Sequence, residues 1–261
     1  MRIGVGWVLL GGLALPSLAD WPHAIKWDQS VGGLDSYAAA SWIDLDTPSD
    51  ALTADDYLCD GLAEHVYVTD LEFYGFSYYG IDYLDKFRVS FWTDVPATPN
   101  DASHPGSLLY QYEVSPADPG DPLKIGWHRP DPVSEPYKFK IDLPEDQWFY
   151  QGPGEKVLWV SIQGVMVTDG FFDAFYWFFK DRALPTWGDD AAFTSEYFGY
   201  PPWFNWGFPN PDPGTGPELY DGPFPPGWFN SADMAFTLTA VPEPVTGVLL
   251  ALGALAFLRR R

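Results

Sequence analysis

The chain contains a single cysteine, Cys59, among its 261 residues. No disulfide can therefore form within it, and stability must come from the core, with bound ions as a further source. A catalytic cysteine needs an activating histidine or cationic surroundings. Cys59 is instead followed by Asp60, and the nearest histidine in the sequence is His65. We therefore predict a buried, structural thiol at this position.

Basic residues are also scarce, with 14 Lys and Arg against 36 Asp and Glu and a formal net charge of −22. Arg2 and the three C-terminal arginines belong to the terminal segments described below, as does Glu243. The body between them keeps 10 basic and 35 acidic residues, a formal charge of −25. The electric field of this negative charge repels nucleic acid and anionic lipid surfaces. Divalent cations, neutral glycans and basic proteins remain as partners. Disordered acidic chains are poor in aromatic residues, whereas aromatics make up 18% here, so we predict a folded body.

Sequence motifs for catalysis are missing as well. Neither G-x-S-x-G nor H-E-x-x-H occurs, and the four histidines show no metal-ligand spacing: His23, His65, His104 and His128. Glycosidases use two carboxyl groups roughly 5–10 Å apart, but 35 acidic residues in the body do not single out a pair. We therefore predict that the protein is not an enzyme.

The N-terminus has the pattern of an export signal. Arg2 precedes an apolar run that reaches Leu15, and small residues follow at Ser17 and Ala19. This order of charge, apolar segment and small residues is what signal peptidase recognises. The sequence predicts a signal peptide over residues 1–19, with cleavage after Ala19.

The C-terminus carries three elements in order. Pro242, Glu243 and Pro244 precede an uncharged apolar stretch of 14 residues, 245–258, and the chain closes with Arg259, Arg260 and Arg261. A membrane-spanning helix usually needs about 20 apolar residues, so this predicted helix crosses only by thinning the bilayer or drawing in its flanks. The arginines are expected to stay on the cytoplasmic side. A helix this short suits a temporary anchor in the inner membrane.

These residues resemble the PEP-CTERM sorting signal, in which Pro-Glu-Pro, a short hydrophobic helix and a basic cluster stand in this order at the extreme C-terminus. The resemblance implies a Gram-negative bacterium that makes extracellular polysaccharide. It also implies a processing partner, the membrane-embedded cysteine protease exosortase, which removes the tail during export. It covers residues 241–261 and indicates a destination, the cell envelope or the extracellular space.

The body, residues 20–240, is predicted to be one antiparallel β-sandwich of jelly-roll type. Its 26 prolines and 25 glycines, counted over the whole chain, disfavour long helices. Strand-like runs with turn-rich segments between them recur along it. These runs cover residues 66–73, 86–91, 108–114, 137–143, 157–165, 171–179 and 233–239.

One segment, residues 187–229, is rich in aromatics and proline and is predicted to be a long ordered loop rather than strands. Sugar rings stack on flat aromatic side chains while nearby polar groups hold their hydroxyls. Trp203, Trp206 and Trp228 lie in this segment and are candidates for glycan binding. The alternative is that they cap the sandwich core.

Calcium takes about six to eight oxygen ligands, and paired aspartates supply such oxygens. The candidates are Asp55 with Asp56 and Asp189 with Asp190, joined by Asp44 and Asp46, each pair being expected on a loop. Solvated surface acidity is the alternative for any one pair. No EF-hand loop is present in the sequence, so a calcium site would have to be assembled by the fold.

The body also resembles uncharacterised exported sandwich domains that precede this sorting tag. The resemblance rests on short strings at residues 26–29, 54–57, 104–106, 187–191 and 232–236, and it implies a sandwich of unassigned activity. Together these observations predict an exported envelope or matrix protein with a structural or adhesive role. The alternative is a lectin-like module that binds extracellular polysaccharide.

Overall fold

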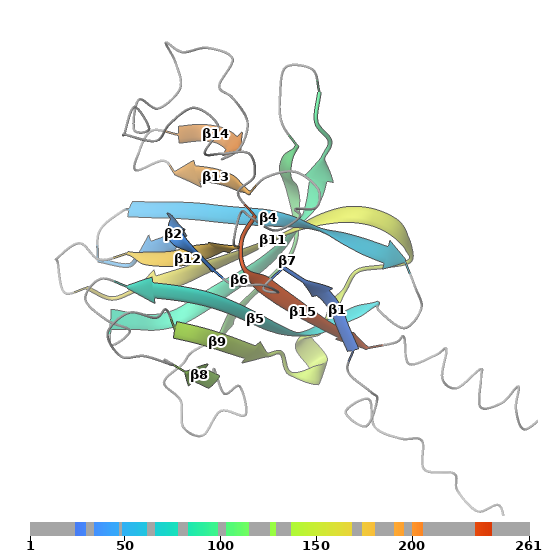
Figure 1. The fold of residues 1–261 in the computed structure, drawn as a ribbon, viewed down its shortest axis with the longest axis horizontal. Helices are drawn as coiled ribbons and strands as arrows, with labels where there is room; N and C mark the ends of the chain where they lie inside the picture. The colour runs from blue at the N-terminus through green and yellow to red at the C-terminus, as the bar shows by residue number, and fades with distance from the viewer. Residues whose placement is uncertain are drawn as a thin grey trace, which may run out of the picture.

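The computed structural model describes residues 24–29, 34–46, 49–61, 66–77, 83–98, 103–114, 126–128, 137–168, 174–180, 191–195, 200–205 and 233–241. Across these ranges the chain is almost entirely β-strand, and the strands form two sheets that pack face to face (Figure 1). The all-β sandwich predicted from the sequence is confirmed. The predicted signal peptide and the predicted helix at 245–258 lie outside these ranges. No helix within the ranges is long and apolar enough to span a membrane.

Sheet A contains eight of the described strands. Its main path runs through β1 (Ala24–Asp28), β15 (Phe236–Val241), β5 (Tyr67–Ser77), β12 (Phe175–Lys180) and β2 (Leu34–Ala40). On the other side of β5 lie β10 (Phe149–Tyr150) and β9 (Tyr137–Asp142), and β8 (Gly126–His128) pairs with β9. A short 3₁₀ helix, η4 (Glu145–Gln147), connects β9 to β10. The central strand of this sheet is therefore β5.

Sheet B contains seven of the described strands. In order these are β14 (Tyr200–Asn205), β13 (Ala192–Ser195), β4 (Ser49–Gly61), β3 (Trp42–Asp44), β11 (Gly154–Met166), β6 (Leu84–Val95) and β7 (His104–Val114), with β4 also paired to β11. The short strand β3 runs parallel to β11, and the other described pairings in both sheets are antiparallel. Neighbouring strands are mostly distant in sequence, as in jelly-roll sandwiches.

Aromatic rings from both sheets fill the space between them. Phe73, Phe139 and Phe175 come from sheet A and meet Phe87 of sheet B, with ring centroids 5.0, 4.8 and 5.1 Å from that of Phe87. All four side chains are buried, and most of the contacts are edge-to-face, the arrangement that aromatic quadrupoles favour. Cys59 is also buried in this core, as predicted.

The chain changes sheets at Ser41, between β2 and β3. The Ser41 amide donates to the carbonyl of Phe175 in sheet A at 2.9 Å, and its carbonyl accepts from the amide of Gly164 in sheet B at 2.9 Å. Its hydroxyl donates to the carbonyl of Ile162 at 2.6 Å and accepts from the amide of Thr53 at 3.3 Å. This fully buried corner therefore satisfies its polar groups while it joins the two sheets.

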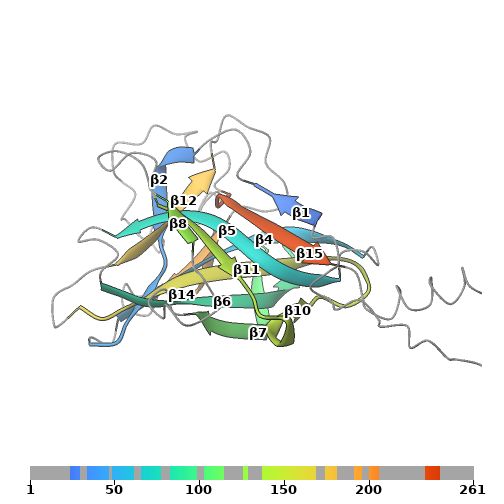
Figure 2. The ribbon, with the colours of Figure 1, turned by 90° about the horizontal axis from the view of Figure 1, so that it is seen from below.

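The first and last described strands lie side by side. Ala24 of β1 is paired with Ala240 of β15, and Val241, the last residue of β15, is followed in the sequence by Pro242. On its other side β15 pairs with β5, where Val241 faces Tyr67. In both views β15 and β5 point in opposite directions, and β12 lies at the end of the sandwich that β15 points away from (Figures 1 and 2). The tail is thus attached at the end of a strand that is bonded on both sides.

Two segments differ from the sequence predictions. The 13-residue strand β4 includes Asp55 and Asp56, which were expected on a loop. The predicted loop at 187–229 contains the hairpin of β13 and β14, and the rest of that segment lies outside the described residues. The strand β14 was not predicted because it contains Pro201 and Pro202, and proline lacks the N–H that a central strand needs. In the structure β14 is the last strand of sheet B, where proline is tolerated.

Candidate functional site

A second aromatic cluster lies on the outer face of sheet B. Leu158 and Val160 of β11 belong to the main core, whereas Trp159 between them belongs to a separate cluster with Ala54 and Ala192. Because side chains alternate along a strand, Trp159 points away from the sandwich interior. Its side chain is nevertheless fully buried. This part of the outer face is therefore covered and packed.

Two further tryptophans pack against this cluster. Trp92 of β6 and Trp203 of β14 are each partly exposed. Their ring centroids lie 6.2 Å apart and their planes meet at 78°. Perpendicular rings form a corner rather than a flat platform. We call Trp92, Trp159 and Trp203 the tryptophan corner.

Hydrogen bonds fix two of these rings. The indole N–H of Trp159 donates to Oδ1 of Asp94 at 2.8 Å, and the Ser103 hydroxyl donates to the same oxygen at 2.8 Å. The indole N–H of Trp92 donates to the hydroxyl of Ser161 at 3.0 Å. Both N–H groups are thus used inside the protein, so Trp92 can offer a ligand only its ring surface. Ser103 and Ser161 are buried, whereas Asp94 is partly exposed. A rigid aromatic surface beside a partly exposed carboxylate is a combination that suits sugars.

Of the three tryptophans predicted to bind glycans, Trp203 lies in this corner, and Trp206 and Trp228 lie outside the described residues. Sequence reasoning missed Trp92 because it sits in a strand far from the aromatic segment. Trp92 is identified only by its position in β6 opposite Trp159. That position could be known only from the register between β6 and β11.

Asp55 lies on the inner face of β4 and bridges the two sheets. Its Oδ2 accepts from the amide of Met234, just before β15, at 2.7 Å, and its Oδ1 accepts from the amide of Asp56 at 3.0 Å. The side-chain amide of Gln29, oriented to satisfy its partners, donates to Oδ2 of Asp55 at 2.8 Å and to the Met234 carbonyl at 3.0 Å. Asp55 therefore joins β4 to the segments that end β1 and begin β15.

Burial raises the pKa of Asp55 well above its usual value, and the carboxylates of Asp233 and Asp56 raise it further. The backbone hydrogen bonds from Met234 and Asp56 act in the opposite direction. Desolvation disfavours a charge here more than these donors favour it. The Asp55 carboxyl therefore links the two sheets, and its buried position disfavours the ionised form.

The aspartates predicted to bind calcium do not converge within the described residues. Asp56 is opposite Trp159 of the tryptophan corner, whereas Asp55 is opposite Val160 of the core. The two carboxylates therefore leave β4 on opposite faces. No group of three or more His, Cys, Asp or Glu side chains arranged to hold a metal ion occurs among the residues described. Asp189 and Asp190 lie outside them.

Asp44 and Asp46 hold a turn. Oδ1 of Asp44 accepts from the amide of Asp46 at 2.9 Å, and Oδ2 of Asp46 accepts from the amide of Thr168 at 2.9 Å. The Thr168 hydroxyl lies 3.3 Å from Oδ2 of Asp44. Both aspartates therefore connect the end of β3 to the end of β11. Short polar side chains often have this structural role in turns.

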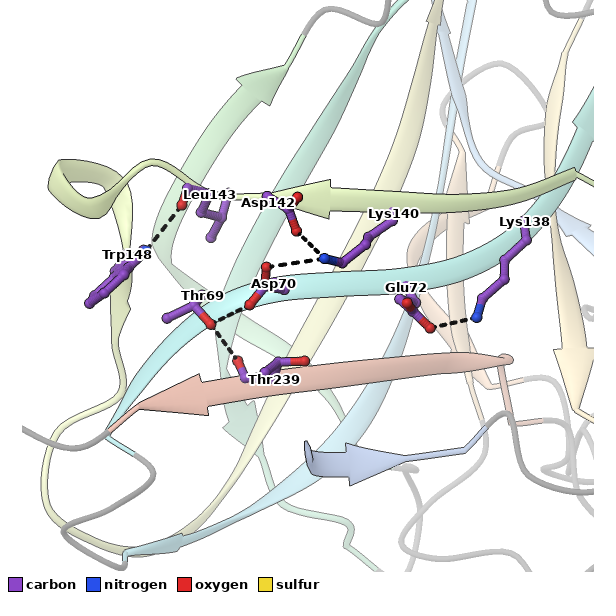
Figure 3. A network of polar contacts seen from close by, with 9 residues as sticks. All are labelled: Thr69, Asp70, Glu72, Lys138, Lys140, Asp142, Leu143, Trp148 and Thr239. Carbon is purple, nitrogen blue, oxygen red and sulfur yellow. Dashed lines mark hydrogen bonds and ion pairs between the residues drawn. The ribbon is translucent and has the colours of Figure 1, made fainter. Parts of the chain in front are cut away.

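A ladder of charged side chains covers part of the outer face of sheet A (Figure 3). Lys140 lies 2.6 Å from Oδ1 of Asp142 and 3.8 Å from Oδ1 of Asp70, and Lys138 lies 2.6 Å from Oε2 of Glu72. Asp70 and Asp142 are direct cross-strand partners. Burial raises the pKa of Asp142, as does its hydrogen bond with Asp70, while Lys140 opposes them.

Comparison with protein families gives one match. The family model described as Domain of unknown function (DUF7901) matches residues 20–239. Comparison with curated proteins and with solved structures found no match.

Proposed function

We propose that this chain, which belongs to the family described as Domain of unknown function (DUF7901), is an exported component of the cell envelope or extracellular matrix with a structural or adhesive, non-enzymatic role. Its destination is proposed from the ends of the chain. The signal peptide at 1–19 sends it across the inner membrane, and the PEP-CTERM-like tail presents it to exosortase. Asp55 and Asp56 point to opposite faces of β4, so these two carboxylates together do not form the predicted calcium site.

The attachment of the tail supports a body that stays folded while it is anchored, before exosortase removes the tail. β15, which leads into Pro242, is bonded along both edges, to β1 and to β5. A force applied to the tail is therefore resisted by two ladders of backbone hydrogen bonds. An edge strand would have only one such ladder and could be peeled away from the sheet more easily. A body held in this way remains folded while it is tethered, and it is then delivered as the folded scaffold that an adhesive or structural protein needs.

Fractionation of the native host tests the destination. We expect the wild-type protein in the envelope or the medium. A variant in which Pro242, Glu243 and Pro244 are all replaced by alanine keeps the predicted helix and arginines but loses the sorting motif, so it should remain unprocessed in the inner-membrane fraction. Identical distribution and size of the two proteins would count against the sorting proposal.

A second candidate function, glycan binding, is favoured by the tryptophan corner. Its two partly exposed rings lie at a fixed angle, beside the partly exposed carboxylate of Asp94. The corner geometry suits one sugar ring held between two aromatic surfaces better than an extended chain laid over a platform. The ligand proposed for it is a neutral glycan, since the formal charge of −25 on the body repels anionic polysaccharides.

Replacing Trp203 by alanine should weaken glycan binding about tenfold, since it removes one of the two rings. The measurement is a titration of tryptophan fluorescence with neutral oligosaccharides. Tyr150→Ala is the matched control, because Tyr150 is an exposed aromatic residue (46%) away from the corner. Equal affinities of the wild type and Trp203→Ala, or no glycan-dependent signal from the wild type, would rule the corner out as a glycan site.

A further inference from the structure

A second group of partly exposed aromatic side chains lies on the outer face of sheet A. Phe175 and Trp177 of β12 point into the core, so Tyr176 and Phe178 between and beyond them point outward. Phe76 of β5 is the cross-strand partner of Tyr176, and the two rings are nearly parallel, at 15° with centroids 5.0 Å apart. The rings of Phe76 and Phe178 lie 5.4 Å apart. With Tyr74, two residues before Phe76, they form what we call the distal aromatic strip.

Small side chains border the strip on one side. Ala40 of β2 is paired with Tyr176, and Ala38 is paired with Phe178. An alanine side chain ends at its Cβ, whereas a long side chain would lie across the neighbouring ring. The strip is therefore bordered toward β2 by two small side chains.

Charged hydrogen-bonding groups border the strip on the other side. The Lys138 ammonium lies 5.8 Å from the centre of the Tyr74 ring and 2.6 Å from Oε2 of Glu72. Burial by itself lowers the pKa of Lys138, but the hydrogen bond to Glu72 acts in the opposite direction, and the net effect is a raised pKa. A fixed ammonium and carboxylate are thus placed at the end of a row of rings.

The strip lies at the end of the sandwich away from the tail. Val241, beside the tail, pairs with Tyr67 at the start of β5, and Phe76 lies nine residues farther along the same strand. At about 3.3 Å per residue this is roughly 30 Å. Figures 1 and 2 both show β12 at the opposite end from the end of β15. When the tail is in the membrane, the strip is held away from it.

We propose that the distal aromatic strip binds a neutral polysaccharide chain, and that together with the tryptophan corner on the opposite sheet it lets one molecule bridge two chains. Sugar rings stack on Phe76, Tyr176 and Phe178, and their hydroxyls bond with Lys138 and Glu72. A second protein is a poorer fit, because a stable interface needs about 800 Å² on each partner with an apolar centre, and this strip runs directly into the charged ladder. The bridging part of the proposal depends on glycan binding at the tryptophan corner, whereas binding by the strip does not.

Binding is tested with the full chain purified in detergent and a panel of soluble neutral polysaccharides (dextran, a β-glucan and a galactomannan), with alginate as the anionic control. Tyr176→Ala should weaken binding to the best neutral member about tenfold once Trp203→Ala has removed the other site. Ala38→Glu keeps every ring but places a long charged side chain beside Phe178, and it should have a similar effect. Tyr150→Ala, an aromatic on the tail side of the same sheet, should change affinity less than about twofold.

Turbidity of a mixture with the same polysaccharide separates the two sites. The wild type should cross-link the polysaccharide, and variants of either site alone should bind without cross-linking. Cross-linking that survives Trp203→Ala would refute the tryptophan corner and leave the strip standing. Unchanged affinity in both Tyr176→Ala and Ala38→Glu, a wild type that binds no member of the panel, or a dimer that either substitution dissociates would overturn the strip as a polysaccharide site.

Discussion

Gly75→Ala is expected to lower the free energy of unfolding by about 3 kcal/mol, because the position has no room for a side chain. A Cβ there would lie 2.5 Å from Cε2 of Phe175, closer still to Cζ, and 2.8 Å from the carbonyl oxygen of Tyr176. The Phe175 ring cannot move aside, since it is buried against Phe73 and Phe87. Chemical denaturation of the two proteins measures the difference.

A double-mutant cycle identifies the cause. Phe175→Leu removes Cε2 and Cζ but leaves the Tyr176 carbonyl in place. In that background Gly75→Ala should therefore still cost about 1 kcal/mol, with coupling of about 2 kcal/mol. A cost that is the same in both backgrounds would show that the close approach of Gly75 to the Phe175 ring does not determine the packing of this core.

Asp55→Ala is expected to cost about 3 kcal/mol, the second large effect. It leaves the amides of Met234 and Asp56 and the side chain of Gln29 without their acceptor in a buried site. It also removes the link from β4 to the segment that begins β15. Asp50→Ala is the control, because Asp50 lies on the same strand but is exposed, and it should change stability by less than about 0.5 kcal/mol. Equal losses in the two variants would contradict the bridging role of Asp55.

The cost of Asp55→Ala should depend on pH. Because the pKa of Asp55 is raised in the folded state, the folded protein holds this proton more tightly than the unfolded chain. The contribution of Asp55 is therefore greatest below the ordinary value of 3.8 and decreases as the pH rises through the folded-state pKa. The gap in unfolding free energy between wild type and Asp55→Ala should narrow from mildly acidic to neutral pH. A gap that widens over this range would mean that the hydrogen bonds to Asp55 outweigh its desolvation.

The sandwich could be predicted because its strands carry a period-two pattern where one face is buried. The run at 86–91 alternates cleanly, and it lies within β6, where Phe87, Val89 and Phe91 enter the core. β4 shows no such pattern because its residues at 53–57 are buried on both faces, and buried aspartates look like loop residues in a sequence. The burial of Asp55 is compensated by hydrogen bonds from the residues at positions 29 and 234. These positions are too distant in the sequence for a local pattern around Asp55 to predict the contacts.

The candidate sites were harder to predict than the fold. Trp203 was found from its aromatic neighbours in sequence, but its contact with Trp92 depends on how the hairpin of β13 and β14 lies against β6. The distal aromatic strip depends in the same way on the pairing of β5 with β12, which brings Phe76 beside Tyr176. Surfaces built across strands follow from register, and the turns and pairings that set register are not written in any one segment.

The intact mass of the protein recovered from its host tests most directly the claim that this is an exported protein with a removable sorting tail. We expect a species that begins at Asp20 and has lost the predicted helix at 245–258 together with Arg259, Arg260 and Arg261, recovered from the envelope or the medium. A protein of full length, from Met1 to Arg261 and confined to the cytoplasm, would contradict it.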